Sequence, residues 1–271
     1  MGLALSPDGK TICYSWGTSP FSAYDVATKK RKWASGFFSS FGAARFSGDG
    51  RLLVVSHAEG VGKGIAYSVL NASTGRIVSQ WRAAALYEDE TALDFSSDGR
   101  FVVSVGSRTD SPDYKGGLGH DGRDVEIHDV QNGRLVRRIF CPWTTSVRFS
   151  PNGNQVVVVA DSVRPNGGSF GKQIRCFDRK TGVLLWSYGA QRGDQWNTAI
   201  FSPDGTTVAV YQTRQPQTIL LLNAQGGTLK YTLKAQNRGD FILTPDSLAF
   251  SPDSKRLFAR GKDAVLVWDL D

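Results

Sequence analysis

Histidines are the first residues to examine for chemistry, because imidazole is a common general base and metal ligand near neutral pH. His57, His120 and His128 are scattered along the chain. No Gly-x-Ser-x-Gly or His-Glu-x-x-His motif accompanies them. The spacing therefore indicates neither a nucleophile–base pair nor a zinc site, and we predict that the protein is not an enzyme and holds no cofactor.

One long insertion, residues 107–124, gathers carboxylates around His120. Its acidic residues are Asp110, Asp113, Asp121 and Asp124. Oxygen-rich loops can hold calcium, but this spacing matches no twelve-residue calcium loop. We therefore predict that this segment and its companion, residues 161–172, are solvated loops without a metal.

Three further features of the sequence could indicate a ligand, and none of them does. The segment EGVGKG at 59–64 lacks the GxxxxGK[ST] spacing of a phosphate-binding loop. The net charge of +7 is spread along the chain, which indicates no specific nucleic-acid partner. Cys13, Cys141 and Cys176 include no CxxC pair, so neither a disulfide framework nor a zinc knuckle is predicted.

The composition is that of an ordinary globular protein, with 271 residues of which 40% are hydrophobic and 21% charged. No apolar run approaches the ~18 residues that a membrane-spanning helix needs, so no membrane contact is expected. The first residues, MGLALSPDGK, lack the features of a secretory signal. We therefore expect a cytoplasmic location.

A short turn phrase recurs six times and shows how any functional residues must be positioned. One example is Phe201-Ser202-Pro203-Asp204-Gly205. The serines of the six phrases are Ser6, Ser47, Ser96, Ser150, Ser202 and Ser251. Proline presets φ, Asp or Asn bonds the local backbone, and glycine accepts a positive φ. Apolar segments precede and follow each phrase, which predicts six β-hairpins.

A second signal follows each hairpin and predicts two more strands per unit. Its pairs are Tyr24-Asp25, Leu70-Asn71, His128-Asp129, Phe177-Asp178, Leu222-Asn223 and Trp268-Asp269. Most of these pairs precede a Thr-Gly, Asn-Gly or Gly-Gly turn and another apolar segment, as a tight hairpin requires. Each unit is thus predicted to be a four-stranded antiparallel sheet, and helical periodicity is absent.

Such small sheets cannot bury both faces alone, and stacking them around an axis solves this problem. With its paired Ser-Pro-Asp-Gly and Trp-Asp-like signals, the chain resembles the WD-repeat β-propeller family, in a divergent form. The phrase DRKTGVLLWSY is also similar to quinoprotein-type propellers. The resemblance implies an all-β propeller with Asp25, Asn71, Asp129, Asp178, Asn223 and Asp269 at the structural Trp-Asp-type turns.

We predict one propeller domain over residues 1–271, with six blades. The predicted blades span 1–36, 37–82, 83–140, 141–188, 189–235 and 236–271, and the last lacks its outer strand. Either six blades close imperfectly, or the protein extends upstream, with a seventh blade in the ring. We expect the extension, and with it additional sequence or domains in the native protein.

The loops that join one predicted blade to the next are rich in aromatic residues and arginines, which are the usual anchors of protein interfaces. The candidate partner-binding residues are Phe37, Phe38, Phe41, Tyr87, Trp143, Arg192, Trp196, Arg238 and Phe241. These aromatics could instead pack between the blades. We predict a non-catalytic interaction scaffold that presents these loops to protein partners. The alternative is a quinoprotein- or lactonase-like enzyme with a ligand or metal in the central channel.

Overall fold

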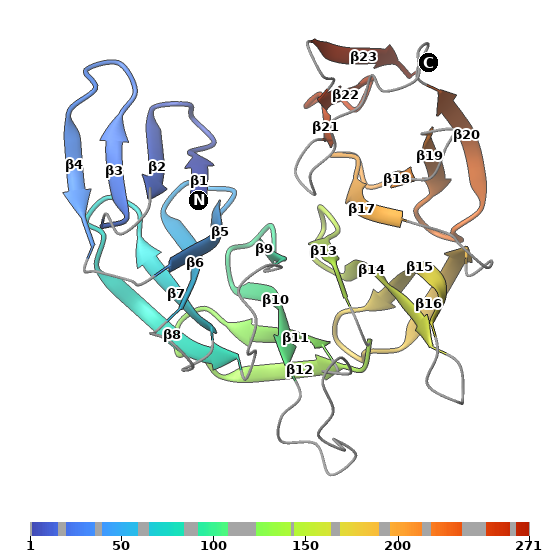
Figure 1. Cartoon of the computed structure of the whole chain (residues 1–271), viewed down its shortest axis with the longest axis horizontal. Coiled ribbons are helices and arrows are strands. Elements are labelled where there is room, and N and C mark those ends of the chain that lie inside the picture. The colour runs from blue at the N-terminus through green and yellow to red at the C-terminus, as the bar shows by residue number, and fades with distance from the viewer. Residues whose placement is uncertain are drawn as a thin grey trace. The chain divides into compact units, whose positions relative to one another are not determined.

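A computed structural model describes most of the chain, and the described residues form strands and short turns (Figure 1). They are residues 2–15, 20–35, 40–58, 65–83, 92–107, 123–141, 144–163, 169–189, 196–212, 218–234, 248–260 and 264–270. The chain divides into two compact units, 1–143 and 144–271, each described here by itself. No helix long and apolar enough to cross a membrane occurs in these described ranges.

Unit 1 contains three four-stranded antiparallel sheets, which are blades 1 to 3. Blade 1 consists of β1 (Gly2–Leu5), β2 (Thr11–Ser15), β3 (Ser22–Asp25) and β4 (Arg31–Ala34). Blade 2 consists of β5 (Ser40–Phe46), β6 (Leu52–Ala58), β7 (Ile65–Asn71) and β8 (Ile77–Ala83). Blade 3 consists of β9 (Leu93–Phe95), β10 (Phe101–Ser107), β11 (Arg123–Asp129) and β12 (Leu135–Ile139).

Unit 2 contains blades 4 to 6, and the last of these has three strands. Blade 4 consists of β13 (Ser146–Phe149), β14 (Gln155–Val163), β15 (Ser169–Asp178) and β16 (Leu184–Gly189). Blade 5 consists of β17 (Trp196–Phe201), β18 (Thr207–Gln212), β19 (Thr218–Asn223) and β20 (Leu229–Lys234). Blade 6 consists of β21 (Leu248–Phe250), β22 (Arg256–Arg260) and β23 (Val265–Asp269). The predicted all-β propeller class, with six blades and a last blade without an outer strand, is confirmed for the described residues.

The turn between the first two strands has the same hydrogen bonds in all six blades. In blade 5, Ser202 Oγ donates to Asp204 Oδ1 at 2.5 Å and accepts the N–H of Thr207 at 3.0 Å. Asp204 Oδ1 also accepts the N–H of Thr206 at 2.9 Å, and Gly205 takes a φ of +72°. The serine hydroxyl bonds its Asp or Asn at Ser6, Ser47, Ser96, Ser150, Ser202 and Ser251. These hydrogen bonds join residues of the turn itself, so the local sequence is sufficient to make the turn rigid.

The turn between the third and fourth strands is closed by the Asp or Asn of the second signal. Asn71 Oδ1, for example, accepts the N–H groups of Ser73 and Thr74, both at 3.1 Å. The same acceptor role belongs to Asp25, Asp129, Asp178 and Asn223. Asp269 ends β23 and lies 3.7 Å from the Nε atom of Arg256. Five of the six predicted turn residues thus close such a turn within the described residues.

Neighbouring blades within each unit are joined by side chains of the outer strands. Trp186 in β16 donates its Nε1–H to the carbonyl of Ala224 in blade 5 at 2.8 Å. In unit 1, Trp33 in β4 makes the equivalent bond to the carbonyl of Ala72 at 2.8 Å. Both indoles are buried, so β4 and β16 each dock on the turn of the next blade. The hydrophobic core of each unit lies between its blades.

Candidate functional site

Most of the partner-binding residues predicted from the sequence lie outside the described residues. These are Phe37, Phe38, Tyr87, Trp143, Arg192, Arg238 and Phe241. The backbone of Phe41 pairs with His57 in blade 2. Trp196 begins β17 and is only 4% exposed, with its ring centroid 6.0 Å from that of Tyr188. Trp196 is therefore packed in the interior. This is the alternative that the sequence analysis gave for the aromatic residues of these loops.

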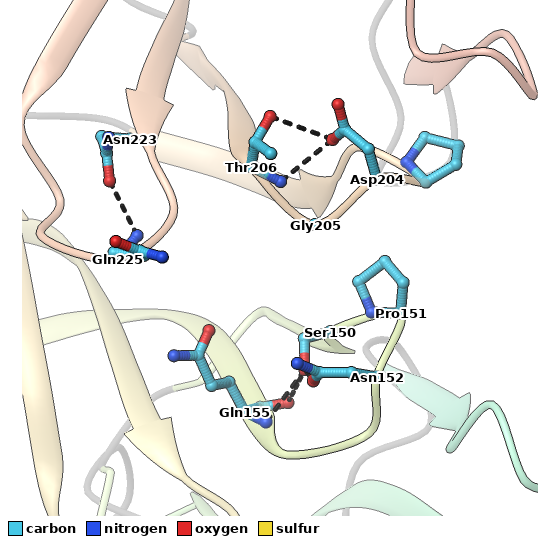
Figure 2. Close-up of a pocket in the computed structure, with 10 residues that line it drawn as sticks. Ser150, Pro151, Asn152, Gln155, Asp204, Gly205, Thr206, Asn223 and Gln225 are labelled. Atoms are coloured by element: carbon cyan, nitrogen blue, oxygen red, sulfur yellow. Dashed lines mark hydrogen bonds between the residues drawn. The ribbon is translucent and has the colours of Figure 1, made fainter.

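A polar cleft lies in unit 2 between the turns of blades 4 and 5 (Figure 2). Its volume is about 630 Å³. The walls are formed by Ser150, Pro151, Asn152, Gln155, Pro203, Asp204, Gly205, Thr206, Asn223 and Gln225. Among the described lining residues the one carboxylate is on Asp204, and it accepts the hydrogen bonds of its own turn. The other described lining residues offer neutral amide and hydroxyl groups, which suit a polar contact.

A second cleft of about 390 Å³ lies in unit 2 between the outer strand of blade 5 and blade 6. Its apolar walls include Leu221, Tyr231, Leu233, Phe250 and Leu270. Its polar walls include Ser202, Asp204, Thr206, Thr207, Lys230, Thr232, Ser254 and Asp269. This cleft therefore combines exposed aromatic surface with charges of both signs.

A serine–histidine contact exists in blade 2, although the sequence spacing indicated none. His57 Nε2 lies 2.8 Å from Ser68 Oγ. The two residues lie on adjacent strands, where Val55 pairs with Ser68 and His57 with Ala66. They are thus diagonal neighbours on one face of the sheet, a relation that depends on strand register. Both side chains are buried, at 2% and 0% exposure, so no substrate reaches them and the pair serves the interior of the blade.

In blade 3 the buried residues Glu126 and His128 lie beside the partly exposed Arg138. Arg138 donates from Nε and Nη2 to Glu126 Oε1 at 3.1 and 2.8 Å. His128 stacks on Trp81 of blade 2 with ring centroids 4.6 Å apart. Burial, with the nearby Arg138 guanidinium, lowers the pKa of His128 to about 4. His128 is therefore neutral near pH 7, and its 3.9 Å approach to Glu126 is not an ion pair there.

Cys13 and Cys176 are poor nucleophiles, because the thiolate is the reactive form. Burial raises the pKa of Cys13 and of Cys176 to about 12. The part of the chain that the structure describes brings together no group of three or more His, Cys, Asp or Glu residues that could hold a metal ion.

The outer strands of several blades expose aliphatic side chains at one equivalent place. These side chains stand six and seven residues after the Asp or Asn of the closing turn, at Ile77, Val78, Leu135, Val136, Leu184 and Leu185. We call these six residues the outer-strand row. In blade 4, Val183 extends it to three consecutive residues that are 59%, 48% and 45% exposed. Sequence reasoning missed this row, because apolar residues in a strand usually indicate its buried face.

No protein-family profile matches the chain, and no curated protein matches its sequence. Among solved structures, it is similar to hydrazine synthase of Kuenenia stuttgartiensis, with a TM-score of 0.70 and 16% sequence identity. The similarity covers 100% of this chain and 84% of that chain. At this identity the likeness shows the fold alone, and membership of the WD-repeat family stays a prediction. The chain therefore has a β-propeller fold with six blades.

Proposed function

We propose that the protein is a non-catalytic interaction scaffold that binds protein partners through surfaces carried by its blades. The observation that carries this proposal is the outer-strand row, and above all the exposed run Val183-Leu184-Leu185. Single exposed aliphatic residues are normal, but consecutive exposed ones are unfavourable unless they have a use. A partner that covers this run would remove its apolar surface from water, at about 25 cal/mol per Å².

The blades suit this role because they hold their surfaces rigidly. Side-chain hydrogen bonds close both kinds of turn, and buried indoles join neighbouring blades in each unit. A rigid surface loses little conformational entropy when a partner binds. In this proposal the interblade loops that the sequence analysis singled out form a second partner-binding surface. The proposal also retains the cytoplasmic location expected above.

Loss of the exposed run is expected to weaken partner capture by about tenfold, since two truncated interface anchors commonly contribute this much or more. The variant is Leu184→Thr with Leu185→Thr, which retains side chains suited to strands. The matched control is Arg31→Thr with Lys32→Thr, at the equivalent exposed place of blade 1. Quantitative co-purification from cell extract, with thermal unfolding as the test of folding, compares the three proteins.

The control is expected to capture the same partners as the wild type. If the leucine variant folds and also captures the same partners as strongly as the wild type, the outer-strand row is not the binding surface. The proposal would then have lost the observation on which it depends.

The enzyme alternative is separated by a different measurement. The name of the structural neighbour is that of an enzyme, but 16% identity transfers the fold and no activity. A quinoprotein- or lactonase-like protein would bind calcium or a quinone cofactor. Titration of the purified chain by calorimetry is expected to show no heat of binding for either, and saturable binding would favour the alternative.

A further inference from the structure

The cleft between the turns of blades 4 and 5 has neutral residues at places that are charged in other blades. Five of the six hairpin turns have an aspartate two residues after the turn serine, and blade 4 has Asn152 there. The five are Asp8, Asp49, Asp98, Asp204 and Asp253. Two residues further on, four turns have a basic residue, whereas blades 4 and 5 have Asn154 and Thr206. Of these two charges the blade 4 turn carries neither, and the blade 5 turn carries only the acidic one.

The hydrogen bonds of the turn do not require asparagine. Asn152 Oδ1 accepts the hydroxyl of Ser150 at 2.7 Å and the N–H of Asn154 at 3.0 Å. In blade 5, Asp204 Oδ1 accepts the two equivalent bonds, at 2.5 and 2.9 Å. Both residue types thus close the turn, and they differ in the atom that the turn does not use. That atom is an amino nitrogen, which donates, in Asn152 and a carboxylate oxygen, which accepts, in Asp204.

A second asparagine lines the cleft in the same orientation. Asn223 Oδ1 accepts the N–H groups of Gln225 at 2.8 Å and of Gly226 at 3.2 Å. Because these donors are backbone N–H groups, the side-chain oxygen faces them and the amino group faces the other way. Within the described residues, no hydrogen bond engages Nδ2 of Asn152 or Asn223, or the side-chain amide of Gln155 or Gln225. The cleft therefore has four amides with hydrogen-bonding capacity left for a ligand.

The cleft has the size and the rigidity of a binding site. Its volume of about 630 Å³ falls within the range of about 300–1,000 Å³ that is usual for small-molecule sites. Gln155 of blade 4 and Gln225 of blade 5 lie on opposite sides of it (Figure 2). The two blades are held together beside the cleft, where Trp186 donates to the carbonyl of Ala224 at 2.8 Å. A ligand in this cleft would therefore meet amides on two walls that are fixed in place before it binds.

The lining indicates the chemistry of the ligand. An anion would find no basic side chain among the described lining residues, and the carboxylate of Asp204 is engaged by its own turn. Of the lining that the structure describes, Pro151 and Pro203 supply the apolar side chains, so there are no pockets for the side chains of a peptide. A sugar hydroxyl both donates and accepts, as an amide does. The C–H groups of a sugar ring could lie against the prolines.

We propose that this cleft binds an uncharged oligosaccharide, whose hydroxyls bond the amides of Asn152, Gln155, Asn223 and Gln225. The inference goes beyond the proposed scaffold function and does not depend on it. A short sugar exchanges hydrogen bonds with water for similar bonds in the cleft, so each bond contributes little net affinity. The expected dissociation constant is on the order of 1 mM.

The test is a titration of the full chain followed by ¹H–¹⁵N NMR, which observes side-chain amides directly. The probes are maltotriose, cellotriose and triacetylchitotriose, with trigalacturonic acid as the charged comparison. At least one uncharged trisaccharide is expected to shift the side-chain amide signals of Asn152 and Asn223 in a saturable way. The acidic trisaccharide is expected to leave them unchanged. Absence of shifts with all three uncharged sugars at about 20 mM, far above the expected dissociation constant, would overturn the proposal.

Asn152→Asp is the decisive variant, because it keeps the bonds of the turn and replaces the free donor by a carboxylate oxygen. It is expected to weaken binding of the sugar by about tenfold, since a hydroxyl would lose one bond and face a desolvated charge. The matched control is Asn71→Asp, which makes the same change in the closing turn of blade 2 and is expected to bind as the wild type does. Thermal unfolding checks that both variants are folded. Equal affinity of the two variants would contradict the assignment.

Two further arms separate this site from other interpretations. If the uncharged peptide acetyl-Gly-Ser-Gly-amide shifts the same amide signals and none of the sugars does, the cleft binds a peptide and the carbohydrate assignment is wrong. The Leu184→Thr/Leu185→Thr variant is expected to bind the sugar with unchanged affinity. Loss of partner capture in that variant and loss of sugar binding in Asn152→Asp therefore report on two separate surfaces.

Discussion

Gly227→Ala is expected to lower the free energy of unfolding by about 2–4 kcal/mol, since it combines two costs at one position. Gly227 has a φ of +68°, which costs an L-residue roughly 1 kcal/mol. A Cβ there would lie 2.5 Å from Cε3 of Trp186, so the buried indole must move. Its movement would break the bond to the Ala224 carbonyl, whose net contribution is about 1 kcal/mol, and would disturb the packing between blades 4 and 5.

Two matched glycines separate these costs. Gly9 has nearly the same φ, +70°, but no atom lies within 4 Å of an added Cβ, so Gly9→Ala measures the backbone cost. Gly226 has an open environment without a positive φ, so Gly226→Ala is expected to change little. Urea unfolding followed by tryptophan fluorescence gives the three values. If Gly227→Ala is no more destabilising than Gly9→Ala, the docking of the indole on this turn contributes nothing to stability.

Acidification is expected to destabilise the protein through His128, by about 3 kcal/mol at pH 4. The pKa of His128 is lowered from 6.5 to about 4, first by burial and then by Arg138. The unfolded chain therefore binds this proton at a higher pH than the folded chain. The contribution of neutral His128 is fully present above about pH 6.5 and is lost as the pH falls towards 4. Urea unfolding at intervals from pH 7 to pH 4 measures this loss.

His128→Phe is the control, because a phenyl ring can keep the stacking on Trp81 and cannot be protonated. The carboxylates of the turns contribute equally to the pH dependence of the wild type and of the His128→Phe variant. For example, the hydroxyl of Ser6 holds the pKa of Asp8 below its usual range, so that contribution is also lost in acid. The difference between the two pH profiles therefore isolates His128. Parallel profiles would mean that His128 is protonated in the folded protein without cost.

The blades could be predicted from the sequence because their turns are local. Ser202, Asp204 and Thr207 lie within six residues, so the composition of this phrase already contains the hydrogen bonds that close it. The docking of Trp186 on Ala224 joins residues 38 positions apart. Such a contact depends on how two finished sheets pack, and the sequence contains no local signal for it.

The candidate site was harder to predict, because exposure depends on packing. Trp196 has the residue type of an interface anchor, yet the strand that it begins carries it into the core of unit 2. Leu184 and Leu185 have the residue types of a core, yet the outer strand of blade 4 leaves them exposed. The contact between His57 and Ser68 likewise depends on strand register, which residue spacing does not reveal.

We propose that this protein binds protein partners on the outer strands of its blades. Hydrogen–deuterium exchange of the chain with and without its captured partner tests it most directly, because amides on the free side of an outer strand exchange readily until they are covered. Slower exchange across residues 183–187 is expected in the complex. Unchanged exchange there, with protection confined to other parts of the bound chain, would contradict it.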